Sequence, residues 1–318
     1  MAPTLPAMVT QADIPERHIA MVYDKPGAVS LRQQVVPTPR PAHGVGIKWV
    51  SSACLICPPC LDGADGCCLN LKISGYYTPG TFQQYTLAPA YYVTPIPEAV
   101  PSPVAAPLLC GGLTALAAMK KTNAPRSSWL LVAGAGGGVG HLVCQIAAKA
   151  YGHRVVGVDS ASKEALVREC GADEFISLEE IQGGPPDQNT LVDMVRKLSG
   201  GLGVAAAVVC TGHLAAYDAS LECLRFNGTL VVVGVQEGEE APIQTASPNT
   251  FLFHQRRIVG SSVGNRQDAL EVMALAAQGI IKPCFIQRSL DELPEIFQKM
   301  EDGKLLGKVV VQVPDTLA

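Results

Sequence analysis

The 318-residue sequence is short of the features that mark nucleic-acid-binding, membrane and secreted proteins. Lysine and arginine total 24 against 28 acidic residues, so there is no basic surplus to attract phosphate backbones. Aromatic residues, at 5%, are too few for a base-stacking platform. No apolar run reaches the ~20 residues that cross a bilayer, and the first residues have no basic stretch followed by an apolar one, as a secretory signal would. We therefore expect a cytoplasmic protein with no nucleic-acid or membrane partner.

What the sequence does contain is cysteine, eleven in all, with five in the stretch CLICPPCLDGADGCC. Because the cytosol keeps thiols reduced, such a cluster there is more often a metal or redox site than a disulfide knot. The spacing Cys54-x2-Cys57-x2-Cys60-x7-Cys68 suits tetrahedral Zn²⁺, and four thiolates leave no open position, so the predicted zinc is structural. The alternative is a redox pair, but ICPPCL lacks a surrounding thioredoxin-like unit. Cys67 is then a spare thiol, and the six scattered cysteines are interpreted as small buried apolar residues.

Hydrophobic patterning divides the chain into a β-rich first third and an alternating remainder. From Trp129 onward, continuous apolar strands alternate with helices, which is typical of a parallel sheet covered on both faces. The predicted fold class is α/β, with a Rossmann-type doubly wound parallel sheet and a second, β-rich domain. The strand patterns expected in the β-rich part are residues 19–24, 29–36, 45–50, 81–89 and 91–97.

The segment WLLVAGAGGGVGHLVCQ has the order of a dinucleotide site: a strand, a glycine-rich turn and a helix. Gly137 and Gly140 take the places of the second and third glycines of G-x-G-x-x-G, and Ala135 takes the first. Gly137 would let the backbone approach a pyrophosphate, Gly140 would let the helix pack close to the strand, and free N–H groups at the helix start would hold the phosphates. The predicted cofactor-binding turn comprises Gly134, Ala135, Gly137, Gly138, Val139 and Gly140.

The next strand pattern, RVVGVDS, ends in Asp159, nineteen residues after Gly140. A carboxylate at this place accepts hydrogen bonds from both hydroxyls of the adenosine ribose and repels a 2′-phosphate, so the sequence predicts NAD rather than NADP. Lys163 follows four residues later and could reach the same ribose. The alternative is a glycine-rich turn that binds nothing, with Asp159 acting only as the cap of the helix that follows.

With these motifs in place, the chain resembles the zinc-containing, medium-chain alcohol dehydrogenase family, in its fungal tetrameric type. The matching segments, in family order, are VVPTPRP, GIKWVSSACLICPPC, ISGYYTPGTFQQY, APLLCGGLTAL, AGAGGGVG, VVGVD, NGTLVVVGV, IVGSSVGNR and LPEIFQKMEDGKLLGKVVV. The resemblance implies reversible hydride transfer between a small alcohol or aldehyde and NAD, a structural zinc in the cysteine stretch, and a homo-oligomer, either dimer or tetramer. It also implies three parts: a GroES-like catalytic domain over residues 1–100, a Rossmann domain over 101–264, and a segment, 265–318, that returns to the catalytic domain.

Further site residues follow from the resemblance alone. Cys110, in LLCGG, matches a ligand of the family's catalytic zinc. Lys308 stands where the family has a phosphate-binding arginine, and a lysine there keeps the charge but loses the bidentate fork. The residues implied to face the nicotinamide are Val233, Val235, Ser261 and Val263.

One block of the family pattern is absent. Between the proline-rich segment and GIKW, the family carries G-V-C-H-T-D and G-H-E motifs, which supply the other catalytic-zinc ligands and the start of the proton relay. Here His43 runs directly into Gly44, and no His-Glu pair exists among the six histidines. A catalytic zinc needs about three protein ligands and an open position, so Cys110 alone cannot hold it. We expect His43 to be solvated in its proline-rich loop, and the GroES-like domain to be truncated by several strands.

Two explanations for this gap stay open. The sequence could reflect an exon skipped in a gene model or splice form, or a shortened relative that has lost catalysis. The leading hypothesis is an NAD-dependent alcohol dehydrogenase-like oxidoreductase whose incomplete site supports little turnover. The alternatives are an NAD-binding pseudoenzyme or partner subunit, and a zinc-independent reductase of secondary metabolism.

Overall fold

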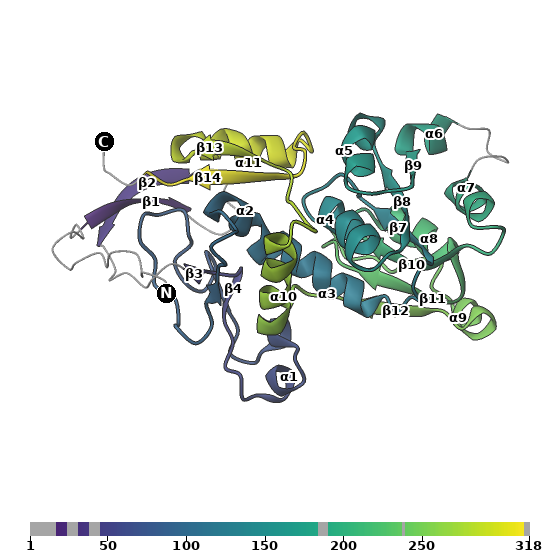
Figure 1. The fold of residues 1–318 in the computed structure, drawn as a ribbon, viewed down its shortest axis with the longest axis horizontal. Helices are drawn as coiled ribbons and strands as arrows, with labels where there is room; N and C mark the ends of the chain where they lie inside the picture. Colours follow the sequence, from purple (N-terminus) through teal and green to yellow (C-terminus); the bar gives the residue numbers. More distant parts are fainter. Residues whose placement is uncertain (1–16, 24–30, 38–44, 184–189, 237–238, 315–318) are drawn as a thin grey trace.

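The computed structural model of the chain describes residues 17–23, 31–37, 45–183, 190–236 and 239–314. A six-stranded sheet with helices on both faces occupies the right of Figure 1, and smaller β pairs and the cysteine stretch lie at the left and bottom. The position of His43, and with it the expectation that this histidine is solvated, lies outside the described residues.

The large sheet has the strand order β12-β11-β10-β7-β8-β9, and every neighbouring pair is parallel. The chain runs outward from β7 to β9, returns beside β7 as β10, and then runs outward on the other side. In such a sheet the crevice for a ligand forms at the carboxyl ends of the two strands where the order reverses, here β7 and β10. The strands are β7 (Trp129–Ala133), β8 (Arg154–Asp159), β9 (Glu174–Ser177), β10 (Val204–Val209), β11 (Leu224–Val232) and β12 (Arg257–Gly260).

The strands of this sheet are apolar throughout because both faces are covered. In β7, Leu130 and Val132 belong to one buried cluster, whereas Leu131 and Ala133 belong to the cluster on the opposite face. The predicted doubly wound parallel sheet is therefore confirmed. Helices α3 (Leu113–Lys121), α4 (Gly140–Gln145), α5 (Glu164–Glu169) and α10 (Arg266–Ala277) contribute to the first cluster, and α7 (Leu191–Leu198) and α8 (Leu214–Glu222) to the second.

A continuous helical run, Ser102–Lys121, precedes the sheet. It comprises α2 (Ser102–Pro107), the π-helical turn η3 (Leu108–Gly112) and α3. By length and composition it is apolar enough to cross a membrane, so the expectation that no run reaches that length was wrong. Of its most apolar window, 72% is buried inside the protein, which accounts for the apolar composition as core packing.

The β-rich part contains only short strand pairs. β1 (Arg17–Tyr23) and β2 (Leu31–Pro37) form an antiparallel hairpin, whereas β3 with β6 and β4 with β5 pair over two or three residues. Residues 81–89 were predicted as a strand but form bends and irregular chain, with a single β-bridge residue at Gln83. The bounds of the short strands are β3 (Val45–Gly46), β4 (Val50–Ser52), β5 (Lys72–Ile73) and β6 (Thr94–Pro95).

After α10 the chain returns to the β-rich side of the molecule. β13 and β14 form a parallel pair, seen with α11 at the upper left of Figure 1. The remaining elements are α1 (Pro58–Leu61), η2 (Asp65–Cys67), η4 (Ile146–Ala150), η5 (Ala161–Lys163), α6 (Leu178–Gly183), α9 (Pro248–His254), β13 (Phe285–Ser289), η6 (Leu290–Glu292), α11 (Leu293–Glu301) and β14 (Lys308–Gln312).

Candidate functional site

The glycine-rich turn leaves the carboxyl end of β7 at the reversal point of the sheet. Gly134 has a φ of +75°, a left-handed backbone that favours glycine, so the tight turn occurs one residue before Ala135, where the motif frame had placed the first glycine. The N–H groups of Gly134 and Ala135 donate to the Val158 carbonyl at 2.9 and 3.2 Å, which holds the turn against β8. A Cβ on Gly140 would overlap the Gly134 carbonyl oxygen, so the helix start packs directly on the turn.

Asp159, at the end of β8, is buried beside this turn. Its Oδ2 accepts a hydrogen bond from the Gly136 N–H at 2.8 Å, and its Oδ1 accepts one from the Ser160 N–H at 2.8 Å. Lys163 Nζ lies 3.0 Å from Oδ1, and the Lys163 stem packs against Gly136. Because each carboxylate oxygen has two acceptor sites, this arrangement orients Asp159 and still leaves it able to accept from hydroxyl groups of a ligand.

Lys308 reaches the opposite side of the turn from the far end of the sequence. Its backbone N–H donates to the Cys284 carbonyl at 2.9 Å. Its side chain crosses Gly138 and Gly111 so closely that a Cβ built on either glycine would lie within 3 Å of Lys308 Cε. The structure thus brings one cation to the glycine-rich turn at the Gly138 side and another, Lys163, at the Asp159 side, which is a suitable environment for an anionic dinucleotide.

The four residues expected at the nicotinamide differ in their position and exposure. Val233 and Ser261 follow β11 and β12 side by side, because the Ser261 N–H donates to the Val232 carbonyl at 2.9 Å. Ser261 is buried, and its Oγ has no hydrogen-bond partner among the described residues. Val235 is 84% exposed. Val263, with a φ of +42°, packs its side chain into the apolar cluster of the cysteine stretch.

The cysteine stretch forms a lobe around four converging thiols, hereafter the cysteine lobe, residues 54–68. The Sγ atoms of Cys54, Cys57, Cys60 and Cys68 all lie within 4.8 Å of one another. Cys57 Sγ is 3.4 Å from Cys60 Sγ and 3.9 Å from Cys68 Sγ, close to the about 3.8 Å edge of a tetrahedron with Zn–S bonds of about 2.3 Å. The donor set and its geometry therefore fit a structural zinc ion.

Backbone N–H groups point at these sulfurs, as thiolates require. The N–H groups of Cys54 and Asn70 donate to Cys68 Sγ at 3.2 and 3.3 Å. Hydrogen bonds from the Ile56 and Cys57 backbone lower the pKa of the Cys54 thiol to about 6. Loss of solvation and the neighbouring thiols raise the pKa of Cys60 to about 12, so a thiolate at Cys60 would need a bound cation to stabilise it.

A buried polar network that the sequence reasoning missed supports the cysteine lobe. Tyr92 donates its hydroxyl to Asp65 Oδ2 at 2.9 Å, and Lys48 Nζ lies 4.0 Å from the Tyr92 ring centroid. Lys48 is 1% exposed and donates to the Tyr92 carbonyl and to Thr94 Oγ1. Burial lowers the pKa of Lys48 to about 8, against an opposing effect of Asp65. A lysine within a short strand pattern gives no sequence signal of such a role.

Cys110 lies in η3 and is half-buried, with its carbonyl accepting a hydrogen bond from Thr114 Oγ1 at 2.8 Å. Within the described residues, the cysteine lobe is the one group of three or more metal-ligand side chains, and Cys110 is not in it. The other scattered thiols are poor nucleophiles, because burial raises the pKa of Cys210 and Cys223 to about 12 and that of Cys170 to about 11.

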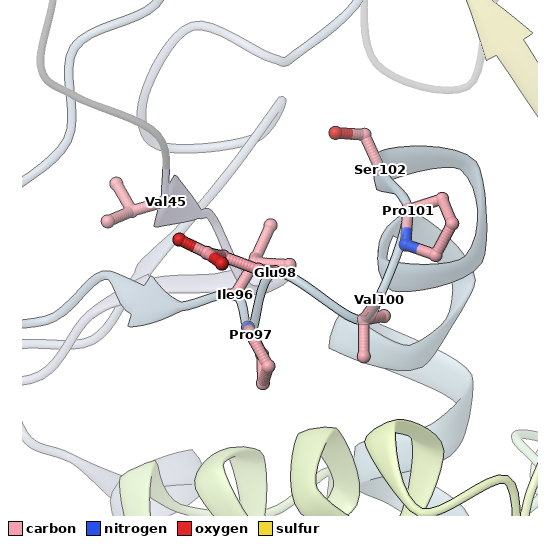
Figure 2. Close-up of a pocket in the computed structure, with 7 residues that line it drawn as sticks. All are labelled: Val45, Ile96, Pro97, Glu98, Val100, Pro101 and Ser102. Atoms are coloured by element: carbon pink, nitrogen blue, oxygen red, sulfur yellow. The ribbon is translucent and has the colours of Figure 1, made fainter. Parts of the chain in front are cut away.

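An open groove of about 420 Å³ lies next to the junction where the family block is absent (Figure 2). Val45, the first described residue after the junction, forms one side, and Pro101 and Ser102 at the start of α2 form the other. Among the described residues that line it, Glu98 is the one charged side chain, and these residues bring together no set of groups that could polarise an alcohol. Its lining residues are Val45, Ile96, Pro97, Glu98, Val100, Pro101 and Ser102.

Two family models match the chain. The model for the alcohol dehydrogenase GroES-like domain matches residues 15–98, and the model for zinc-binding dehydrogenases matches residues 138–278. Alcohol dehydrogenase 2 of Emericella nidulans is 50% identical over 269 residues, which cover 85% of this chain and 73% of that protein. An alcohol dehydrogenase of Schizosaccharomyces pombe is 32% identical over 85% of this chain and 74% of its own length. Acetophenone reductase from Geotrichum candidum, solved in complex with NAD, superposes with a TM-score of 0.76 at 24% identity, over 93% of this chain and 97% of that one.

Proposed function

Because this chain belongs to the zinc-containing, medium-chain alcohol dehydrogenase family, we propose that it binds NAD at the glycine-rich turn and acts in hydride transfer between NAD and a small alcohol or aldehyde. The observation that carries the cofactor assignment is the Asp159 carboxylate, held by the Gly136 N–H beside Lys163 at the end of β8. In that position it would accept hydrogen bonds from both adenosine ribose hydroxyls and repel the 2′-phosphate of NADP.

The chain's own residues would divide the work of holding NAD. The turn from Gly134 to Gly140 would receive the pyrophosphate on backbone N–H groups, and Lys308 would add a positive charge at the Gly138 side. Val233 and Ser261, side by side at the ends of β11 and β12, would border the nicotinamide. When bound, NAD supplies the hydride acceptor. Val235 and Val263 complete the proposed set, Val263 through its backbone because its side chain is taken up by the cysteine lobe.

The four thiolates of the cysteine lobe would hold one zinc ion per chain. With every position filled by sulfur, that ion would stabilise the lobe and would take no part in the reaction. Cys110 matches a ligand of the family's catalytic zinc, and within the described residues it belongs to no group of three or more metal-ligand side chains. An alcohol whose hydroxyl proton has no metal and no relay to leave by is a poor hydride donor near neutrality. We therefore propose that the 318-residue chain alone turns over simple alcohols at a background rate.

A second candidate function is that of an NAD-binding partner subunit without turnover. Two observations favour it. Within the described residues, Cys110 belongs to no group of three or more metal-ligand side chains, and β12 pairs with β11 alone, at the outer edge of the sheet. An open edge strand is suited to pairing with a second chain. We propose a cytoplasmic homo-oligomer, dimer or tetramer, with no nucleic-acid or membrane partner, and the domain division 1–100, 101–264 and 265–318.

Calorimetric titration of the purified full chain with NAD⁺ and NADP⁺, followed by an ethanol-oxidation assay, tests these proposals. Binding of NAD⁺ with background turnover supports the leading proposal. The same result fits the partner-subunit alternative, which in addition requires that a homologue co-purifies with the chain. Turnover that survives a chelator would point instead to a zinc-independent reductase. Failure to bind either dinucleotide would refute the cofactor assignment. Sequencing the transcript across codons 41 to 48 decides whether the gap is encoded.

A further inference from the structure

Helix α4 has two buried polar side chains on one face, His141 and Gln145, which lie one helical turn apart. His141 Nδ1 is 2.8 Å from the Gly137 carbonyl, and His141 Nε2 accepts the Cys284 N–H at 3.0 Å. Gln145 meets the backbone of Lys282 twice: its Oε1 accepts the Lys282 N–H and its Nε2 donates to the Lys282 carbonyl, both at 2.9 Å. Together these side chains hold segment 282–284 against the helix that follows the glycine-rich turn.

The hydrogen bonds of His141 determine its protonation state. A backbone N–H can only donate, so the Nε2 that receives the Cys284 N–H carries no proton. The Gly137 carbonyl can only accept, so Nδ1 carries the proton. Only the neutral Nδ1–H tautomer satisfies both partners, because an imidazolium has a proton on each nitrogen and would oppose the Cys284 N–H.

Segment 282–284 in turn positions Lys308. The Cys284 carbonyl accepts the Lys308 N–H at 2.9 Å, and the Gly307 N–H points to the Gly136 carbonyl at 3.5 Å. A path of hydrogen bonds therefore runs from Gly137 through His141 and Cys284 to Lys308, whose side chain lies on Gly138. Two ends of the phosphate site that are 171 residues apart in sequence, at 137 and 308, are joined through one histidine ring.

We propose that His141, as the neutral Nδ1–H tautomer, is a positioning residue for dinucleotide binding. The ring ties the glycine-rich turn to segment 282–284 so that Lys308 faces the pyrophosphate, and protonation of the ring weakens dinucleotide affinity. The inference rests on the proposed NAD site and adds to it a residue and a pH dependence.

The surroundings of His141 agree with a neutral ring. Burial lowers its pKa below the ordinary 6.5, the Gly137 carbonyl opposes this shift, and the Lys308 charge lowers the pKa further. From the C-terminal segment the titratable neighbours are Lys308, the Cys284 thiol, whose pKa burial raises, and the exposed Lys282. An imidazolium would face this cationic side of the site, so its formation would both break the Cys284 bond and repel Lys308.

Calorimetric titration with ADP-ribose, which carries the pyrophosphate and is stable in acid, at pH 8 and pH 5.5 tests the proposal on the full chain. His141→Asn places a donor near Nδ1 but cannot reach Cys284, so affinity at pH 8 should fall about tenfold, the value of one well-placed hydrogen bond. His141→Gln places an amide oxygen near Nε2, so it should retain most of the affinity. Wild-type affinity should fall between pH 8 and pH 5.5, whereas the affinity of His141→Gln should be nearly flat, because an amide does not titrate.

Two controls separate positioning from general damage. His153→Gln alters another buried histidine, stacked on Tyr151 away from the turn, and should leave both affinity and its pH profile unchanged. In a Lys308→Ala background, His141→Asn should cost much less than in the wild type, because the charge that it positions is gone.

Equal losses from His141→Asn with and without Lys308, or an identical pH profile in wild type and His141→Gln, would overturn the inference. The pH profiles decide the matter even if His141→Asn does not fold. Absence of any ADP-ribose binding by the wild type at pH 8 would instead refute the proposed NAD site.

Discussion

The carboxylate of Asp159 offers the sharpest test of the proposed cofactor preference, through the variant Asp159→Ala. Asp159 is buried and holds the Gly136 N–H, the Ser160 N–H and the Lys163 ammonium. Two ribose hydroxyls that donate to a charged acceptor contribute about 1.5 kcal/mol each or more. Their loss should weaken NAD⁺ binding about 10²-fold.

The same variant should affect NADP⁺ differently. Removal of the carboxylate abolishes its repulsion of the 2′-phosphate, and it frees Lys163, now 3.0 Å from Oδ1, to pair with that phosphate. We therefore expect NADP⁺ to bind at least as tightly as before. The ratio of the two dissociation constants, measured by calorimetry in one buffer, should shrink by at least ~10².

A matched control accounts for the structural cost of the change. Asp173 accepts the Val155 N–H at 2.8 Å near the start of β8, so it makes the same kind of bond at the other end of the same strand. Asp173→Asn should lower the thermal midpoint modestly and leave the NAD⁺ to NADP⁺ ratio as it is. Equal affinity of the wild type for both dinucleotides, or an unchanged ratio in Asp159→Ala, would refute the assignment.

Three further outcomes are expected. Purified protein should carry one zinc per chain by elemental analysis. Cys57→Ser should lose this zinc and unfold the cysteine lobe, whereas Cys67→Ser, outside the converging set, should keep it. Two zincs per chain would contradict the loss of the catalytic site. The rate of ethanol oxidation by the chain should be at least ~10³-fold below that of an intact relative. Insertion of the absent segment from a homologue between positions 43 and 44 should restore the rate. Strong zinc-dependent turnover without the insertion would disprove this prediction. Burial lowers the pKa of His141 and His153, so both histidines resist protonation in the folded state. Below about pH 6.5 the unfolded chain binds protons at these histidines before the folded protein does, so the denaturant midpoint of unfolding should fall. Equal midpoints at pH 7.5 and 5.5 would contradict this.

The β-rich part shows where reading strands from sequence fails. Residues 81–89 were predicted as a strand, yet the structure gives them bends and irregular chain with a single β-bridge at Gln83. Alternation reports which residues prefer a pleated surface, but a strand also needs a neighbour to pair with, and within the described residues β3 to β6 are two or three residues long. The helical run Ser102–Lys121 shows that composition alone is also ambiguous. Its apolar content would suit a membrane, but most of the run is buried inside the protein.

The elements that have a local cause follow from the sequence alone. Continuous apolar strands between helices predicted the parallel sheet. The glycine-rich turn and Asp159 could be predicted because both lie within one strand–helix–strand unit. The four cysteines could be predicted because residues within a stretch of fifteen can converge in any compact loop. Only the tertiary structure placed Lys308 on Gly138, joined His141 and Gln145 to segment 282–284, and buried Lys48 against Tyr92. These contacts join residues 44 to 170 positions apart, and no periodicity or spacing encodes them. They exist because the packing of the sheet, its helices and the returning C-terminal segment brings buried polar groups together, where each must find a partner.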